Sequence, residues 1–163
     1  MRSRARAMGH SIRPVLIVFP LGLLSTAVIF DIMYMINGNT DFNIASAYAI
    51  AAGVIGGLVA AVFGLVDWLA VPQGTRARSV GLLHGVGNVV VVVLFAVSWM
   101  LRATNIGWEP NAGAIIFGFL GLIVAAVSGW LGGELVERHG IGVHENASPD
   151  APSSLQRTAD NVR

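Results

Sequence analysis

The sequence predicts an all-α polytopic membrane protein, a bundle of four transmembrane helices with both termini in the cytoplasm. Hydrophobic residues make up 55% of its 163 residues and the mean hydropathy is +0.70, whereas soluble domains are usually about 45–50% apolar. Four apolar segments each exceed the roughly 20 residues that cross about 30 Å of hydrocarbon. The ten basic residues, all arginines, are also unevenly placed along the chain.

The spans are expected at about residues 14–36, 42–69, 79–101 and 112–136. Backbone polar groups in lipid must be bonded within their own segment, so the spans should be helices. The short alternating strands of a β-barrel are not seen in the sequence. A basic cytoplasmic segment, 1–13, precedes the spans. A cytoplasmic tail, 137–163, follows them, and its polar end is expected to be largely disordered.

The first span follows the basic stretch "MRSRARAMGHSIR", which also suits a signal peptide. Its apolar part is longer than the 7–15 residues of an ordinary signal sequence, and no clear small-residue cleavage site follows. We therefore expect a retained helix, with Pro14 suited to a first helical position.

The second and fourth spans carry small residues at every fourth position. Such spacing lets helix backbones approach closely in lipid, either within the bundle or between two copies of the chain. Packing within the bundle is the simpler interpretation. The residues are Ala45, Ala49, Gly53, Gly57 and Ala61 in the second span, and Gly121, Ala125, Gly129 and Gly133 in the fourth.

The distribution of arginine predicts the orientation. Four spans place both termini on one side, which would hold nine of the ten arginines, and the other side would hold only Arg102. Cytoplasmic loops carry the excess of positive residues. The termini and the turn at 67–80 should therefore face the cytoplasm, and the loops at 37–41 and 102–110 should face outward.

Polar residues from several spans should meet near the cytoplasmic surface. This expected polar cluster comprises Asp67, Asn88 and Glu134. A carboxylate at a helix end reaches water easily, so the simplest interpretation of both acids is structural. Asp31, at the outer end of the first span, has the same interpretation. The candidate ion-pair partners of Asp67 and Glu134 are Arg13, Arg76, Arg78 and Arg138.

His84 is the most informative single residue, because it lies inside an apolar span beside two glycines. Paired histidines from different helices can hold a haem in a bundle. His10 would be the second ligand by depth, and Arg13, Arg76 and Arg78 could pair with the haem propionates. The alternative is a neutral histidine that is hydrogen-bonded to Asn88, Asp67 or a backbone carbonyl. His139 and His144 follow the last span and are expected to face solvent.

Three stretches carry a family resemblance: "HSIRPVLIVFPLGLL" (10–24), "GLVDWLAVPQGTRARSVGLLHGVGN" (64–88) and "SGWLGGELVERHGIGV" (128–143). The chain resembles, over about residues 8–145, a bacterial membrane family catalogued as domain of unknown function 2231. The resemblance implies a four-span module in the bacterial inner membrane. Family members often have "HP" where this chain has Arg13–Pro14, while His10 and His84 match. Some relatives resemble fusions to Rieske or cytochrome domains, which implies an electron-transfer setting.

Three functions are compatible with these features. The first is a non-catalytic integral membrane protein whose polar cluster stabilises the bundle or docks a partner. The second is an electron-transfer subunit that binds haem b or a quinone near His10 and His84. The third, a small transporter, is disfavoured because no charge lies at mid-span. Expected partners are the lipid bilayer and either a second copy or a membrane redox protein, with no nucleic acid. Cysteine is absent and no hydrolase motif occurs.

Overall fold

The computed structural model describes residues 6–7, 10–11, 13–143 and 147–151, with side chains from Leu16 onward. Four long helices dominate it: α1 (Arg13–Asn37), α2 (Asp41–Leu69), α3 (Arg76–Ala103) and α4 (Ala112–Glu137). Each is long and apolar enough to cross a membrane. The predicted fold class, an all-α bundle of four membrane-spanning helices, is confirmed.

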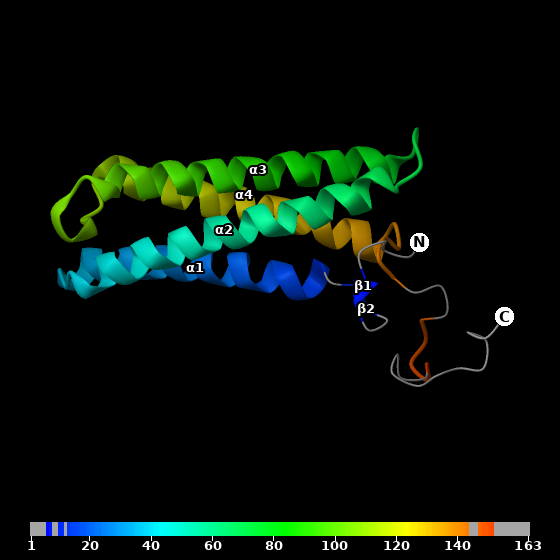
Figure 1. Ribbon diagram of the computed structural model, residues 1–163, viewed down its shortest axis with the longest axis horizontal. Coiled ribbons are helices and arrows are strands. Elements are labelled where there is room, and N and C mark those ends of the chain that lie inside the picture. Colours follow the sequence, from blue (N-terminus) through cyan, green and yellow to red (C-terminus); the bar gives the residue numbers. More distant parts are fainter. Residues whose placement is uncertain (1–5, 8–9, 12, 144–146, 152–163) are drawn as a thin grey trace.

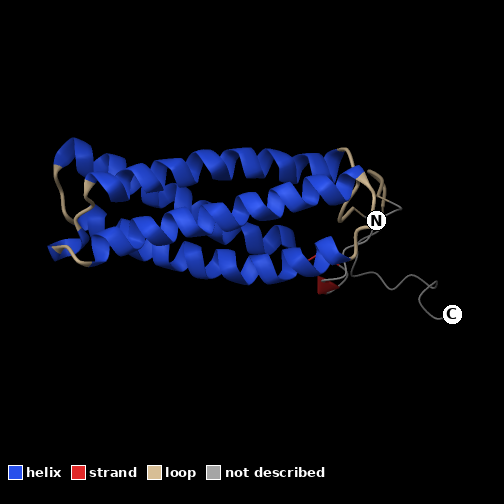
Figure 2. Cartoon of the chain, turned by 90° about the horizontal axis from the view of Figure 1, so that it is seen from above, coloured by secondary structure: helices blue, strands red, loops and turns tan. Residues whose placement is uncertain are grey.

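The helices run side by side along one long axis (Figures 1 and 2). We call one end of the bundle the loop end, where residues 38–40 join α1 to α2 and residues 104–111 join α3 to α4. The other is the turn end, where residues 70–75 join α2 to α3. Two short strands, β1 (Arg6–Ala7) and β2 (His10–Ser11), pair antiparallel at the turn end before α1 begins.

Local sequence signals set the helix boundaries. Thr75 precedes α3, and its hydroxyl accepts a hydrogen bond from the backbone N–H of Arg78. Asn111 caps α4 in the same way through the N–H of Ala114. At the other end of α4, Gly140 adopts φ +61°, and the N–H of Ile141 reaches back to the carbonyl of Leu135. The left-handed backbone at this glycine lets the chain turn back over the last turn of the helix, which ends there.

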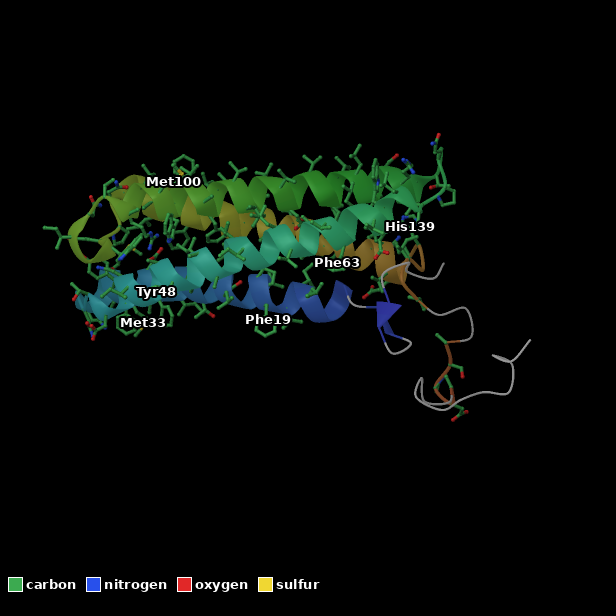
Figure 3. The ribbon with its side chains drawn as sticks, in the orientation of Figure 1. Phe19, Met33, Tyr48, Phe63, Met100 and His139 are labelled. Atoms are coloured by element: carbon green, nitrogen blue, oxygen red, sulfur yellow. The ribbon has the colours of Figure 1, made fainter. Side chains whose placement is uncertain are left out.

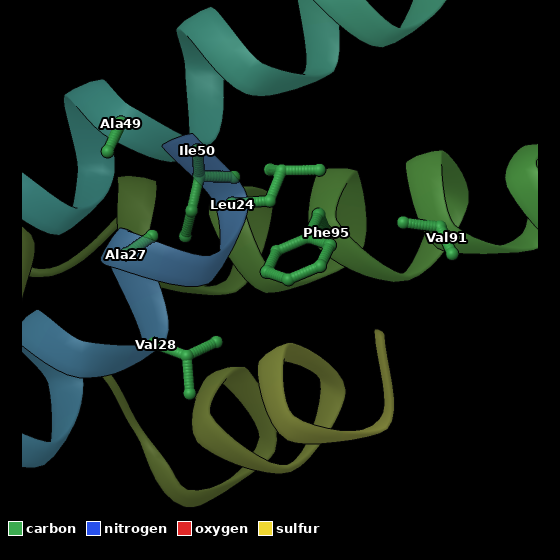
Figure 4. Packing of buried hydrophobic residues seen from close by; sticks show 7 residues of the cluster. All are labelled: Leu24, Ala27, Val28, Ala49, Ile50, Val91 and Phe95. Atoms are coloured by element: carbon green, nitrogen blue, oxygen red, sulfur yellow. The ribbon is translucent and has the colours of Figure 1, made fainter. Parts of the chain in front are cut away.

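The bundle consists of two tightly packed hairpins, α1–α2 and α3–α4, which contact each other mainly through α2 and α3. Between them lies a small apolar core formed by residues of α1, α2 and α3 (Figure 4). Its members are Leu24, Ala27, Val28, Ala49, Ile50, Val91 and Phe95. Large apolar side chains elsewhere face outward, as Phe19 and Met33 do in Figure 3. That pattern suits helices surrounded by lipid tails.

Most of the small-residue positions are used inside the bundle. A Cβ added at Gly53 would lie 2.6 Å from Leu24, and one at Gly121 would lie 2.7 Å from Phe95. At such distances an added methyl group would force Leu24 or Phe95 to shift, so the helices approach closely at both positions, as predicted. Gly129 and Gly133 differ, because an added Cβ would meet nothing within 4 Å.

Candidate functional site

The most extensive polar network lies at the loop end and centres on Arg102. Its side chain is 0% exposed, and it forms a two-pronged ion pair with Asp31, at 2.8 and 2.9 Å. Its other donors reach the hydroxyls of Ser46 and Ser98, at 2.9 and 3.0 Å, and the carbonyl of Ser98, at 3.3 Å. All five N–H groups of the guanidinium are therefore bonded.

This Arg102 network connects all four helices. Asp31 belongs to α1, Ser46 to α2, and Ser98 and Arg102 to α3. The hydroxyl of Ser46 donates onward to the carbonyl of Ala27 in α1. The hydroxyl of Ser98 donates to the carbonyl of Ala114 in α4. Each hydroxyl thus accepts from the arginine and donates to a neighbouring helix.

The sequence did not predict this pairing. Arg102 was expected in an outward loop, but it lies in the last turn of α3 and is fully buried. Asp31 was expected to have a structural role at the outer end of the first span, and it is 2% exposed. A usable signal was present: each is the only charged residue at its end of an apolar span, and the two charges are opposite. Charged residues inside membrane spans usually face the bundle interior and pair with each other.

A second network, at the turn end, joins α3 to α4 through hydrogen bonds of His84, Asn88 and Ser128. The ring Nδ1 of His84 lies 2.8 Å from the carbonyl oxygen of Ser128, and Nε2 lies 3.0 Å from the amide nitrogen of Asn88. The hydroxyl of Ser128 reaches Asn88 Oδ1 at 3.0 Å and the His84 carbonyl at 3.1 Å. His84 and Asn88 are one turn apart on one helix face.

These partners hold both ring nitrogens of His84. A carbonyl oxygen only accepts, so Nδ1 donates to the carbonyl of Ser128. Nε2 faces the side-chain amide of Asn88. Two glycines make room for this contact: an added Cβ at Gly132 would lie 2.9 Å from the His84 ring, and one at Gly87 would lie 3.1 Å from the Ser128 hydroxyl.

The arginines of the turn end form separate local contacts. Arg78 stacks on the Trp68 ring at 4.4 Å and donates to the carbonyl of Val71 at 2.7 Å, so it links the end of α2 to the start of α3. The indole N–H of Trp68 donates in return to the carbonyl of Arg78. Arg76 lies 3.6 Å from Glu134, with the arginine side chain 80% exposed.

Two members of the expected polar cluster contact different residues. Asn88 joins His84, and Glu134 pairs with Arg76. Asp67 is buried near the end of α2, at 6% exposure. The side chains of His10 and Arg13 lie outside the described residues, as does His144. His139 is partly buried, and its Nε2 is fully covered without a hydrogen-bond partner among the described residues, so the expectation that it faces solvent is wrong.

The described residues give no support for a haem at this site. Both ring nitrogens of His84 lie within hydrogen-bond distance of a partner, Nδ1 of the Ser128 carbonyl and Nε2 of the Asn88 amide. Arg78, expected near a propionate, contacts Trp68 and Val71. The contacts of His84 with Asn88 and a backbone carbonyl are those that the alternative expectation named. Within the described chain, no group of three or more metal-ligating side chains is found.

Comparison with known proteins identifies the family and adds no activity. No curated protein and no solved structure matches the chain. Residues 9–145 match the family described as predicted membrane protein (DUF2231). That range contains all four helices, both polar networks and the turn between α2 and α3. The chain, with its four apolar helices, therefore belongs to the DUF2231 family of predicted membrane proteins.

Proposed function

We propose that this protein is a non-catalytic membrane module whose Arg102 network holds two helical hairpins in one fixed arrangement. One observation carries the proposal: every guanidinium N–H of Arg102 is bonded, and its partners connect onward to all four helices. A group that acts on a substrate needs a free donor or acceptor. Here the carboxylate of Asp31 and the guanidinium of Arg102 are bonded to each other, which supports a structural role.

The ion pair bridges the two hairpins, and this is where a structural link has the most effect. Asp31 and Ser46 come from α1–α2, while Arg102 and Ser98 come from α3–α4. Lipid tails are as apolar as leucine, so helix association in a bilayer depends on close packing and interhelical hydrogen bonds. A buried charge without its partner is strongly unfavourable in such surroundings. The pair therefore favours the one arrangement in which both charges are satisfied.

A double-mutant cycle tests the proposal. Asp31→Leu and Arg102→Met should each lower the free energy of unfolding by about 3–5 kcal/mol, because each leaves one buried charge unpaired. The double variant should recover most of that loss, since two apolar side chains leave no charge behind. The measurement is SDS titration of the purified protein in mixed micelles.

The exposed pair Arg76–Glu134 provides the matched control. Arg76→Met, Glu134→Leu and their double variant should differ little from one another, because the arginine is solvated. If the Asp31 and Arg102 losses were simply additive, or as small as those of the control pair, the structural role would be refuted.

We also propose the orientation and location that the arginines predict: a bacterial inner membrane, with residues 1–13 and 137–163 in the cytoplasm. The absence of cysteine makes the test direct, because any introduced thiol is the only one. In spheroplasts, an impermeant maleimide should label Asn105→Cys in the loop 104–111. It should not label Gln73→Cys in the turn 70–75. The reverse pattern would overturn the orientation.

A further inference from the structure

Asn43 is a buried polar side chain that the Arg102 network does not use. It lies in the first turn of α2 and is 0% exposed. Neither its amide nitrogen nor its amide oxygen has a hydrogen-bond partner among the described residues. A buried polar group without a hydrogen bond is unfavourable, so such a group calls for a partner.

The helix register places Asn43 beside the Arg102 network. Ser46 lies one turn further along α2 on the same face, and it bonds both Arg102 and the carbonyl of Ala27. The ring of Phe42 packs against Phe30 of α1 at 5.9 Å. Because α1 and α2 are antiparallel, Asn43 lies opposite the part of α1 that carries Asp31 and Tyr34.

Polar groups continue from this position toward the surface of the loop end. The Tyr34 hydroxyl lies near the Asn43 side chain, but the two do not form a hydrogen bond of good geometry. That hydroxyl donates to the carboxylate of Glu109, at 2.6 Å, in the loop 104–111. On the inner side, each oxygen of Asp31 accepts one hydrogen bond from Arg102, although a carboxylate oxygen can accept two.

We propose that Asn43 and Asp31 bind a buried water molecule at the loop end. The amide nitrogen of Asn43 donates hydrogen bonds and its amide oxygen accepts them, and water can pair with both atoms. The neighbouring ion pair sums to zero charge, so the site favours a neutral ligand over a cation or an anion. A stably bound water needs two to four polar partners, and the Asn43 amide, the Asp31 carboxylate and the Tyr34 hydroxyl are of the required kind.

This inference goes beyond the proposed structural role, because it adds a bound water molecule beside the buried Arg102 network. The apolar core around Phe95 separates it from the turn end. The His84–Asn88–Ser128 network, whose amide is already bonded, should stay dry. Two asparagine amides of one protein therefore have opposite predicted hydration.

The test is an NMR measurement of water contact on the wild-type protein. The chain is selectively labelled with ¹⁵N-asparagine and placed in nanodiscs of deuterated lipid. Magnetisation transfer from water should give a cross-peak at the side-chain amide of Asn43 and none at that of Asn88. The Asn43 signal is assigned by its loss in Asn43→Leu, or by backbone correlation if that variant does not fold.

A resolved Asn43 amide without transfer from water would overturn the proposal, and so would equal transfer at Asn43 and Asn88. Neither result bears on the double-mutant cycle, since the charge pair can hold the hairpins whether or not water is bound. Conversely, an additive cycle with a strong Asn43 cross-peak would refute the structural role and retain the water site.

Discussion

The two polar networks differ in their bonds, in burial and in the helices that these bonds connect. The Arg102 network carries a buried ion pair and joins the α1–α2 hairpin to the α3–α4 hairpin. The His84 network, about 27 Å away along α3, is partly buried, and its hydrogen bonds with Asn88 and Ser128 join α3 to α4, which already pack along their length. The ion pair between Asp31 and Arg102 thus lies between the two hairpins, where the helices pack less closely than within each hairpin.

The comparison also shows why each network has its own chemistry. A planar guanidinium offers five donors, enough to collect acceptors from several helices at once. The His84 network needs only to fill the contact between two close backbones, and Gly87 and Gly132 let them approach. Four variants, in order of decreasing expected effect, test this contrast.

Arg102→Lys should have the largest effect. An ammonium group keeps the charge but has three donors on a compact head, so it cannot reach Asp31, Ser46 and Ser98 together. We expect a loss of about 3 kcal/mol in the free energy of unfolding, from two charged hydrogen bonds that are not replaced. SDS titration measures it, with exposed Arg138→Lys as the control. A free energy of unfolding equal to that of the wild type would mean that a positive charge alone is sufficient at the loop end.

Gly132→Ala should have the second-largest effect on stability. Its Cβ would lie 2.9 Å from the His84 ring and 3.3 Å from Nδ1, so the ring must move and its bond to Ser128 must lengthen. Overpacking of this kind costs about 2 kcal/mol. The adjacent Gly133→Ala is the matched control, because its Cβ meets nothing within 4 Å. Thermal unfolding in detergent should separate the two variants; equal melting temperatures would contradict the close approach of α3 and α4.

Asn88→Leu should have a moderate effect. It removes the donor to His84 and the acceptor of the Ser128 hydroxyl, and interhelical hydrogen bonds in membranes are worth about 1 kcal/mol. Because the ring of His84 then loses the partner of Nε2, a ¹⁵N spectrum of the histidine should change while the helix content stays constant. A loss as large as that of Arg102→Lys would remove the distinction between the two networks.

Arg76→Ala should have the smallest effect. The side chain is 80% exposed and its contact with Glu134 is long, at 3.6 Å. Exposed ion pairs of this kind usually contribute less than about 0.5 kcal/mol. The melting temperature should therefore stay within error of the wild type at both low and high salt. A clear destabilisation would show that the turn end, too, depends on an ion pair.

Hydropathy and helix length were sufficient to predict the fold, because in lipid an apolar segment of this length has few alternatives to a spanning helix. The sites were harder to predict. The pairing of His84 with Asn88 follows from their spacing on α3, but Ser128 comes from another helix. Whether Arg102 belongs to a loop or to a buried pair depends on one further turn of α3. A single sequence does not contain the helix rotations that bring Asp31 and Arg102 together.

The separation of Asp31 and Arg102 along the chain, 71 residues, has a consequence for biosynthesis. At about 5–20 residues per second, the ribosome takes roughly 4–14 s to make the second residue after the first. During that interval α1 and α2 enter the bilayer with an acidic side chain whose counter-charge has not yet been synthesised. The first hairpin must therefore hold an unpaired acidic side chain until α3 arrives and completes the assembly.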